Sequence, residues 1–598
     1  MNQYIAPIRD MQFVMQELAG LDQVLALPGY EEADRDLVDA ILEEAGKFAG
    51  EVLAPLNRVG DMEGCRWESG YVTTPPGFKE AYRQFVESGW NGVACELEFG
   101  GQGLPRLLSS AVREMWKASN MAFSLCPMLT QGAIEALASN GSAELKALFL
   151  EKMVSGEWTG TMNLTEPNAG SDLAAVRTRA EPQADGSYRI FGQKIFITYG
   201  EHDMTDNIVH LVLARLPDAP AGVKGISLFV VPKFLVNADG SLGERNDAWC
   251  ASIEHKMGIH GSPTAVMIFG ENGGATGYLV GEANRGLEYM FVMMNEARFG
   301  VGLEGLAIGE RAYQQALAYA RERVQGKDMT SRSPDSVAII RHPDVRRMLM
   351  LMKAKIEAMR ALAYVVASSL DHAHQASATD ERNKHQVFAD LLIPVVKGWL
   401  TETANELASI GVQVHGGMGF IEETGAAQHF RDARIINIYE GTTGIQALDL
   451  IGRKTARDGG AAAKALVAEM LALDGQLAEQ ADADFTVIRQ ALVEGAAEMD
   501  DCVDYIVENF SANAAEVAAG SVPYLMLVGI VAGGWQMARA ALAARRRLDE
   551  GSGDASFYRA KIATARFYAE HVMTQVAGLS RTLREGGKSV LMLDDEQF

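Results

Sequence analysis

Residues 186–200, GSYRIFGQKIFITYG, concentrate β-branched and aromatic side chains in one short run of this 598-residue chain. Three runs of the same kind follow: NIVHLVLARL (207–216), GISLFVVPKF (225–234) and TAVMIFG (264–270). Turn sequences such as Ala184-Asp185-Gly186 separate them, a pattern that is typical of short strands joined by turns. The sequence therefore predicts a small β domain over residues 161–283.

Both flanks of this β domain have helical periodicity. DRDLVDAILEEAGKFAGEVLAPLNR (34–58) carries apolar residues three and four positions apart. Long helical segments joined by short loops, as seen after residue 284, suggest a bundle. We predict a multidomain α+β fold: an N-terminal extension (1–35), a helical domain (36–160), the β domain (161–283), a helical bundle (284–457) and a helical extension (458–598).

Composition restricts the partners and the location. The net charge of −24 disfavours nucleic acid and anionic membranes as default partners. The five cysteines show no metal-like spacing and are interpreted as reduced thiols, so a cytoplasmic location is expected. SVPYLMLVGIVAGGWQMA, which starts at Ser521, is short and contains glycine and proline. It favours a buried helix over a membrane span.

Two short motifs in the β region carry chemical groups. LTEPNAGSD (164–172) offers hydroxyls at Thr165 and Ser171 around a tight turn, which can present donors to an anion or a polar ring edge. In KIFIT, Phe196 and Thr198 are expected on one face of a strand. Each motif taken alone also fits an ordinary turn or a half-buried strand.

Five stretches occur in order: LTEPNAGSD, GQKIFIT, ARFGVGLEG, RERVQG and GVQVHGGMGF…RDARIINIYEGTTGIQ. Together they resemble the acyl-CoA dehydrogenase family over about residues 40–455. The opening YIAPIRDMQFV and the helical tail are similar to the longer, roughly 600-residue branch. That branch includes dehydrogenases of very-long-chain and methylthio-propionyl thioesters.

The resemblance implies FAD-dependent α,β-dehydrogenation of an acyl-CoA, with Glu440 as the base that takes the α-proton. The thioester carbonyl would accept hydrogen bonds from the Glu440 N–H and the flavin ribityl hydroxyl, which stabilises the developing enolate. Burial in the apolar stretch IINIYEGTTG is expected to raise the pKa of Glu440 and strengthen it as a base. The alternative is a glutamate that only caps the following helix.

Some family members carry the base directly before the arginine of ARFG. Here Ala297 precedes Arg298, and Glu296 is one residue further back. One residue turns a helix by about 100°, so Glu296 would point elsewhere and the base is assigned to Glu440.

The remaining site residues are also implied by the resemblance. Arg323 and the loop around Gln413 would contact FAD across a dimer interface, and Phe196 takes the place often held by tryptophan. The cofactor-binding residues are expected to be Met162, Leu164, Thr165, Gly170, Ser171, Phe196, Thr198, Arg323, Gln413, Gly416, Gly417, Thr442 and Gly444. The substrate-binding residues are expected to be Ser171, Asn295, Arg298 and Gly441.

The finer function stays open at this point. A fatty acyl-CoA of medium or long chain is expected, in fatty acid β-oxidation, with electrons passed to electron-transfer flavoprotein. The alternatives are a short or methylthio-substituted acyl-CoA and an acyl-CoA oxidase. A nucleic-acid-binding flavoprotein is remote, because residues 461–598 hold 12 Lys/Arg against 20 Asp/Glu.

The assembly and the extension are also expectations. A homodimer is expected, in which the tail packs on the body of the enzyme. A bilayer contact through QMARAALAARRRLDEG is the less favoured alternative, because that segment is a poor basic amphipathic helix. Basic residues Arg545, Arg546 and Arg547 are interpreted as a solvated helix face. No metal site is expected, since His202, His255, His260 and His415 lack partners at metal spacing.

Overall fold

The computed structural model describes residues 4–330 and 335–598, and these divide into two compact units. The first unit comprises Lys47–Leu104 and Ser119–Gly300. The second comprises residues 4–46, Pro105–Ala118 and Val301–Phe598. These limits cut across the helical domain expected over residues 36–160, because α6 (Arg106–Ser119) falls almost wholly in the second unit. The finer domain limits stay predictions.

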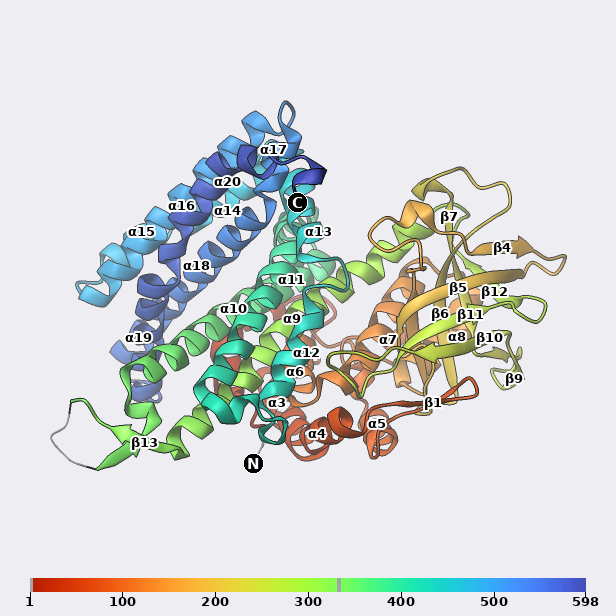
Figure 1. Cartoon of the computed structure of the whole chain (residues 1–598), viewed down its shortest axis with the longest axis horizontal. Coiled ribbons are helices and arrows are strands. Elements are labelled where there is room, and N and C mark those ends of the chain that lie inside the picture. The colour runs from red at the N-terminus through yellow and green to blue at the C-terminus, as the bar shows by residue number, and fades with distance from the viewer. Residues whose placement is uncertain (1–3, 331–334) are drawn as a thin grey trace. The chain divides into compact units, whose positions relative to one another are not determined.

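An eight-stranded sheet forms the centre of the first unit (Figure 1). Its strands are β3 (Trp158–Asn163), β4 (Arg179–Pro182), β5 (Tyr188–Thr198), β6 (Asn207–Arg215), β7 (Ile226–Pro232), β10 (Ala248–Ile253), β11 (Thr264–Phe269) and β12 (Ala275–Val280). The order is β10-β11-β5-β12-β7-β6-β3, and β4 pairs with β5 and β6. All pairs are antiparallel except β3–β6 and β4–β6. The β domain expected from the sequence is present.

β5 organises this sheet because it is long enough to pair with three strands, β4, β11 and β12. Gly192–Thr198 pairs with β11, while Tyr188–Ile190 pairs with β12. Gly192 has φ +157°, and a Cβ there would lie 2.4 Å from Thr178 Oγ1, so only glycine fits this crossing. Apolar residues of several strands, among them Phe229 and Met267, close the core beneath it.

Helices and two hairpins complete the first unit. They are α4 (Ala54–Glu63), α5 (Phe78–Glu87), α7 (Met121–Asn140), α8 (Ala143–Ser155), the hairpin of β1 (Arg66–Glu68) and β2 (Tyr71–Thr73), and the hairpin of β8 (Phe234–Val236) and β9 (Leu242–Arg245). Asn120 caps α7 by accepting from Phe123 N–H at 3.1 Å. Tyr199, at the end of β5, donates to the α7 carbonyl of Ala122 at 2.7 Å. The contact joins the helical part of this unit to its sheet.

Long helices build the second unit. They are α9 (Gly286–Glu322, which begins in the first unit), α10 (Pro343–Gln375), α11 (Thr379–His415), α12 (Ala426–Ile436) and α13 (Thr443–Leu448), joined by α1 (Ile8–Glu17), α2 (Leu21–Leu25), α3 (Arg35–Phe48) and α6. The short hairpin of β13 (Val324–Lys327) and β14 (Ser336–Ala338) connects α9 to α10. The helical bundle expected after residue 284 is therefore present.

The C-terminal extension is helical as predicted and packs on this bundle (Figure 1). Its helices are α14 (Ala461–Leu471), α15 (Asp474–Ala478), α16 (Ala483–Asn509), α17 (Ala514–Ala519), α18 (Ser521–Asp549), α19 (Ala555–His571) and α20 (Val576–Val590). In α18, Gly529 faces the ring of Trp399 on α11 so closely that a Cβ would lie 2.2 Å from it. α18 therefore packs directly against the bundle and joins the extension to it.

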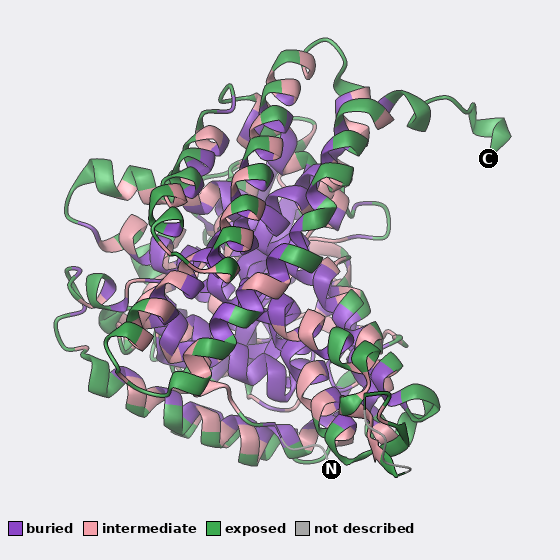
Figure 2. Cartoon of the chain, turned by 90° about the vertical axis from the view of Figure 1, so that its left-hand side faces the viewer, coloured by how far each residue is buried: buried purple, intermediate pink, exposed green. Residues whose placement is uncertain are grey.

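Two helices, α7 and α18, are long and apolar enough to cross a membrane by composition alone. In each, 83% of the most apolar window is buried inside the protein. Figure 2 shows the helices of the second unit with buried residues on their inner faces and exposed residues outside. The stretch that begins at Ser521 is thus a core helix in this structure, as expected.

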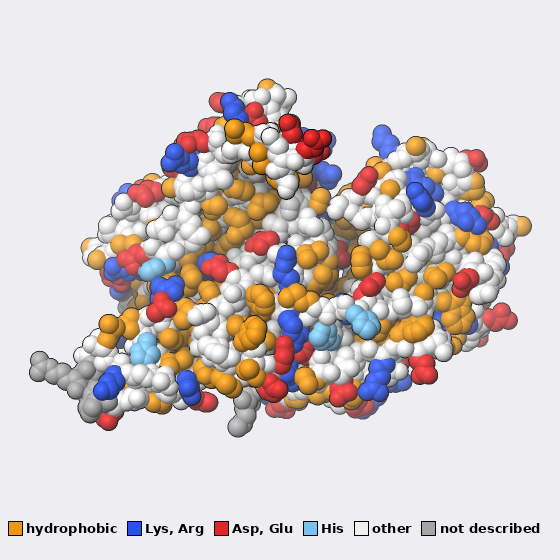
Figure 3. Space-filling view, viewed as in Figure 1, with side chains coloured by type: hydrophobic (Ala, Val, Ile, Leu, Met, Phe, Trp, Pro, Cys, Tyr) orange, Lys and Arg blue, Asp and Glu red, His pale blue; other side chains and the backbone are white. Residues whose placement is uncertain are grey.

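The basic run at the end of α18 is tied to acids. Arg546 and Arg547 both pair with Glu17 of α1, and Arg545 pairs with Asp482 at 2.6 Å. The interpretation of this run as a merely solvated face was therefore incomplete. On the face drawn in Figure 3, Lys and Arg side chains are interspersed with Asp and Glu.

A buried charge network crosses the second unit. Arg360 of α10 donates to Glu114 of α6 and to Glu310 of α9, each at 2.7 Å, and to Asp10 of α1 at 2.6 Å. Lys561 of α19 also pairs with Asp10. Burial opposes ionisation of Asp10, but Lys561 and Arg360 hold its pKa well below the usual range. The network links the start of the chain, the bundle and the extension.

Replacing Arg360 by methionine should destabilise the second unit, because Glu114 and Glu310 would remain buried without their cation. Breaking a buried ionic network costs about 3–5 kcal/mol. The urea midpoint of unfolding measures this. The control, Arg581→Met, removes an exposed pair with Glu585 and should change stability by less than about 0.5 kcal/mol. Equal shifts for the two variants would contradict the role given to the network.

Candidate active site

The loop that follows β3 holds the first group of expected site residues. Glu166 and Ala169 exchange two backbone hydrogen bonds, of 2.9 and 3.0 Å, which close a tight turn. Asn168 donates to the Ala175 carbonyl at 2.8 Å and secures the next part of the loop. Gly170 and Ser171 are exposed beyond this turn. The loop is therefore a braced support that presents small and hydroxylated residues to the outside.

A buried ion pair beneath the loop holds it in place. Glu166 pairs with Lys194 of β5 at 2.9 Å and accepts from the N–H groups of Arg177 (2.7 Å) and Thr178 (3.0 Å). Lys194 also donates to the Leu164 carbonyl at 3.0 Å. Burial lowers the pKa of Lys194 to about 8, although Glu166 opposes this shift. The motifs LTEPNAGSD and GQKIFIT contain Glu166 and Lys194, but no role was predicted for either. The sequence gives no sign that the two side chains are partners.

The structure brings this loop together with the end of β5, as the pairing of the two motifs implied. The Ile195 N–H donates to the Thr165 carbonyl at 2.9 Å. One extra residue on β5 relative to β11 makes a bulge beside Ile195 and Phe196. Phe196 has φ +59° and is 59% exposed, whereas Ile197 is buried. The bulge turns an aromatic ring outward beside the loop, and Thr198 lies half-buried two residues later.

The other residues expected in the first unit lie on β3 and α9. Met162, the penultimate residue of β3, is half-buried, as are Leu164 and Thr165 in the loop that follows. On α9, Arg298 is buried whereas Asn295, three residues earlier, is exposed.

Glu440 lies in the second unit, in the connection between α12 and α13. Glu440 and Gly441 both have positive φ, +55° and +87°, so the chain makes two left-handed steps before α13. Such a conformation is uncommon for a non-glycine residue and persists only where its surroundings hold it. The Thr442 side chain then caps α13 by accepting from the Ile445 N–H at 3.3 Å. Gly444 lies in the first turn of that helix.

Buried polar groups hold the carbonyls of this connection. Lys397 of α11 donates to the Gly441 carbonyl at 2.7 Å, and Gln446 donates to the Glu440 carbonyl at 3.2 Å. Thr443 donates to Glu402 at 2.5 Å. The expected deep burial of Glu440 in apolar company is wrong for this chain: Glu440 is half-buried, Ile438 is 46% exposed, and the groups around them are largely polar. Of the isoleucines before Glu440, Ile435 and Ile436 end α12 and only Ile436 is buried, while Ile438 lies in the connection.

Tyr439, which precedes Glu440, reaches a second buried ion pair. Its hydroxyl donates to Glu304 of α9, and Glu304 pairs with Lys117 of α6 at 3.1 Å. Both charged side chains are buried. Burial, together with Glu304 and Glu440, raises the pKa of the Tyr439 phenol, which therefore remains a neutral donor. The motif ARFGVGLEG contains Glu304, but the sequence did not indicate its partners, which lie 187 and 135 residues away.

The residues expected to reach a neighbouring subunit lie together. Arg323 is exposed at the end of α9, and Gln413, Gly416 and Gly417 are exposed at the end of α11. Tyr319, one turn before Arg323, stacks on His415 with ring centroids 4.5 Å apart. The two helix ends are therefore adjacent. A Cβ at either Gly416 or Gly417 would meet nothing within 4 Å, so the backbone there is open to approach.

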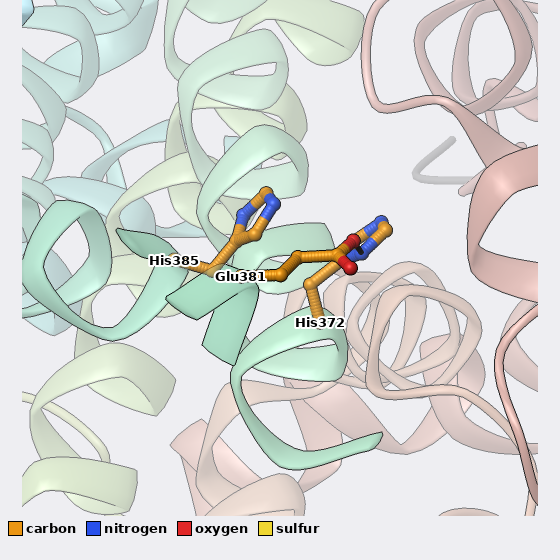
Figure 4. Close-up of side chains that lie close together, drawn as sticks. All are labelled: His372, Glu381 and His385. Atoms are coloured by element: carbon orange, nitrogen blue, oxygen red, sulfur yellow. Dashed lines mark hydrogen bonds and ion pairs between the residues drawn. The ribbon is translucent and has the colours of Figure 1, made fainter. Parts of the chain in front are cut away.

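One group of three metal-ligating side chains occurs among the described residues, and sequence analysis did not single it out. His372, Glu381 and His385 offer atoms within 4.8 Å of one another at the α10–α11 turn (Figure 4). The two imidazoles stack, 4.4 Å apart and 16° from parallel. The lone pairs of nearly parallel stacked rings lie in separate planes, so one ion cannot lie in both. His202 is instead buried and hydrogen-bonded to Thr159 at 2.9 Å.

Four family descriptions match successive parts of this chain. "Acyl-CoA dehydrogenase, N-terminal domain" matches residues 36–157, "Acyl-CoA dehydrogenase, middle domain" residues 161–271, "Acyl-CoA dehydrogenase, C-terminal domain" residues 284–455, and "Acetyl-CoA dehydrogenase C-terminal like" residues 464–594. Together they span most of the chain, including the extension.

Curated relatives match over the full length. The 3-methylmercaptopropionyl-CoA dehydrogenase of Ruegeria pomeroyi is 51% identical over 98% of this chain and 99% of its own. A butyryl-CoA dehydrogenase of Syntrophomonas wolfei is 37% identical over 100% of this chain and 99% of its own. The broad-specificity linear acyl-CoA dehydrogenase FadE5 of Mycobacterium tuberculosis is 35% identical over the whole of both chains.

Two solved structures show the same fold at low identity. Caenorhabditis elegans ACDH-11 in complex with C11-CoA has a TM-score of 0.77 at 19% identity and covers 97% of this chain and 95% of its own. The acyl-CoA dehydrogenase of Bacillus anthracis complexed with FAD has a TM-score of 0.72 at 20% identity, over 98% and 93%. The likeness in fold therefore extends over nearly the whole chain.

Replacing Glu166 by glutamine should loosen the loop after β3, because Lys194 would lose its charge partner inside the protein. A stability loss of about 3 kcal/mol is expected. Hydrogen exchange should accelerate at the Arg177 and Thr178 amides, which donate to Glu166. Glu181→Gln, which removes an exposed pair with Arg179, is the matched control and should leave both amides protected. Unchanged exchange in Glu166→Gln would refute this bracing.

Proposed function

The chain belongs to the acyl-CoA dehydrogenase family, and on this premise we propose that it oxidises a short linear or methylthio-substituted acyl-CoA to the trans-2-enoyl-CoA. The observation that carries the proposal is 51% identity over 98% of the chain to a 3-methylmercaptopropionyl-CoA dehydrogenase. The butyryl-CoA dehydrogenase among the full-length relatives points to the same size of acyl group. This replaces the expectation of a medium- or long-chain substrate.

FAD is the cofactor of this family, and the residues present fit it. Phe196 offers an exposed ring on a strained bulge beside the hydroxyl-bearing loop, which suits the edge of a flat polar ring system. Gly416 and Gly417 leave their backbone open near Arg323, which suits a pyrophosphate or an adenosine. Bound FAD would supply the acceptor for the hydride that leaves the substrate β-carbon.

The residues of this chain supply the base and the positioning. The Glu440 carboxylate would take the proton from the α-carbon, and the Glu440 N–H would donate to the thioester carbonyl as negative charge develops on it. Lys397 and Gln446 engage the carbonyls on either side of the left-handed step, so the base is held through its backbone. Thr165, Ser171 and Thr198 would hold the cofactor, while Asn295 and Arg298 would hold the CoA part.

Electron-transfer flavoprotein is the proposed acceptor of the electrons, within acyl-CoA breakdown in the cytoplasm. An oxidase would instead produce hydrogen peroxide from oxygen in step with enoyl-CoA. Measuring peroxide during aerobic turnover distinguishes the two, and peroxide equimolar with product would make the chain an oxidase.

Replacing Glu440 by glutamine should lower the rate of flavin bleaching by at least about 10³-fold, because the amide cannot take the α-proton. Anaerobic stopped-flow absorbance with 3-methylthiopropionyl-CoA, butyryl-CoA and saturated chains up to C18 measures both the reaction and its length preference. Glu296→Gln is the matched control and should stay within about threefold of wild type. Loss of bleaching in Glu296→Gln instead would move the base to α9, and fastest bleaching with C12 or longer would refute the short-chain proposal.

A homodimer is proposed from the apolar loop after Gly417. Met418, Phe420 and Ile421 are exposed in the single chain, Phe420 by 84%, beside the residues expected to meet FAD across the interface. Phe420→Asp should therefore yield monomers in light scattering and lower the retained flavin by about tenfold, the effect of losing about 1.4 kcal/mol. Leu97→Asp, at an exposed apolar residue elsewhere on the surface, should remain dimeric. A dimeric Phe420→Asp variant would place the interface elsewhere.

A further inference from the structure

Lys117, Glu304 and Tyr439 come from three separate parts of the second unit. Lys117 is on α6, Glu304 is on α9, and Tyr439 lies in the connection between α12 and α13. Lys117 Nζ lies 3.1 Å from Glu304 Oε1, while the Tyr439 hydroxyl donates to Glu304 Oε2. Each oxygen of one buried carboxylate thus engages a different partner.

This arrangement costs desolvation free energy that an apolar trio of similar size would avoid. A buried ion pair is therefore weak evidence of stabilisation, and its retention beside Glu440 calls for another role. Tyr439 immediately precedes Glu440, and its hydroxyl lies near enough to both carboxylates for each to raise its pKa. The phenol is thereby committed to Glu304, and the charge of Glu440 acts on it as well.

The backbone at this point is strained. Glu440 adopts φ +55°, which costs on the order of 1 kcal/mol or more for a residue with a side chain. On its C-terminal side, Lys397 and Gln446 hold the carbonyls. On its N-terminal side the corresponding anchor is the side chain of Tyr439, fixed to Glu304.

We propose that Lys117, Glu304 and Tyr439 are positioning residues for Glu440: the neutral buried ion pair anchors the Tyr439 ring and so fixes the strained backbone that carries the base. Lys117 has a second effect, since its positive charge balances Glu304 and keeps an uncompensated negative charge away from Glu440. The inference rests on the proposed function, because it takes Glu440 to be the base.

Other charges also face this connection within the second unit. Lys397 and Glu402 approach from α11, and Asp432 approaches from α12. None of them is altered in the variants below, so their contribution to the field at Glu440 stays constant.

Two charge variants of the ion pair should shift the titration of Glu440 in opposite directions. Glu304→Gln leaves Lys117 uncompensated, which lowers the pKa of Glu440, so the acid limb of the flavin-reduction rate should move down by about 1 pH unit. Lys117→Met leaves Glu304 uncompensated, which raises that pKa, so the limb should move up by about 1 unit. The double variant should return the limb to its wild-type position.

Tyr439→Phe removes the anchor without changing any charge. The maximal rate of flavin reduction should fall by about tenfold, while the acid limb and the apparent substrate affinity stay within error of wild type. Glu406→Gln is the matched control, because Glu406 pairs with the buried Lys355 at 2.5 Å and lies outside the site. It should leave both the rate and the limb unchanged.

The outcomes separate this inference from the proposed function. If none of the acyl-CoAs bleaches the flavin of the wild-type protein, or if Glu440→Gln reacts at the wild-type rate, the proposed function fails. If wild type reacts through Glu440 and the two charge variants shift the limb in the same direction, or not at all, the inference fails. Bound flavin and circular dichroism identify any variant that has misfolded, and the Tyr439→Phe rate then provides the independent test.

Discussion

The two left-handed residues between α12 and α13 are the constraint on which the chemistry of the second unit depends. Under the proposed function Glu440 has to be held still, and this chain holds it through its backbone. Lys397 binds the Gly441 carbonyl, Gln446 binds the Glu440 carbonyl, and Tyr439 is tied to Glu304. Lys397 and Gln446 are themselves buried, so the strained backbone at Glu440 is held by fixed neighbours.

In the first unit, too, a buried ion pair supports a loop that carries expected site residues. The loop after β3 must present backbone and hydroxyl groups without collapsing, and Glu166 braces it from beneath against Lys194. The bulge at Phe196 turns an aromatic ring out of a strand whose neighbours point inward. In both units a buried glutamate–lysine pair supports a strained element, and an exposed or half-buried functional residue stands above it.

Much of this organisation was predictable from the sequence, and the reasons for the remainder are physical. Periodicity revealed the β domain, the helical bundle and the helical extension, because alternating and three-to-four-residue patterns report directly on burial. The family resemblance of LTEPNAGSD and GQKIFIT implied that the loop after β3 and the end of β5 lie together. Glu304 and Lys117 escaped notice, because a charged residue inside a helix gives no local sign of a partner 187 residues away. The apolar run before Glu440 was misleading, because only Ile436 at the end of α12 is buried, whereas Ile438 in the connection is exposed.

The Asp10 network has a consequence for how the chain is made. Asp10 leaves the ribosome at the start of synthesis, whereas its partner Lys561 lies 551 residues later. At about 5–20 residues per second, the N-terminal helix waits roughly half a minute or longer for that partner. Until then Asp10 lacks one of its two cations, and the inner face of α10 that α18 will cover is open to water. A nascent chain of this kind has to be shielded from association until its last helices arrive.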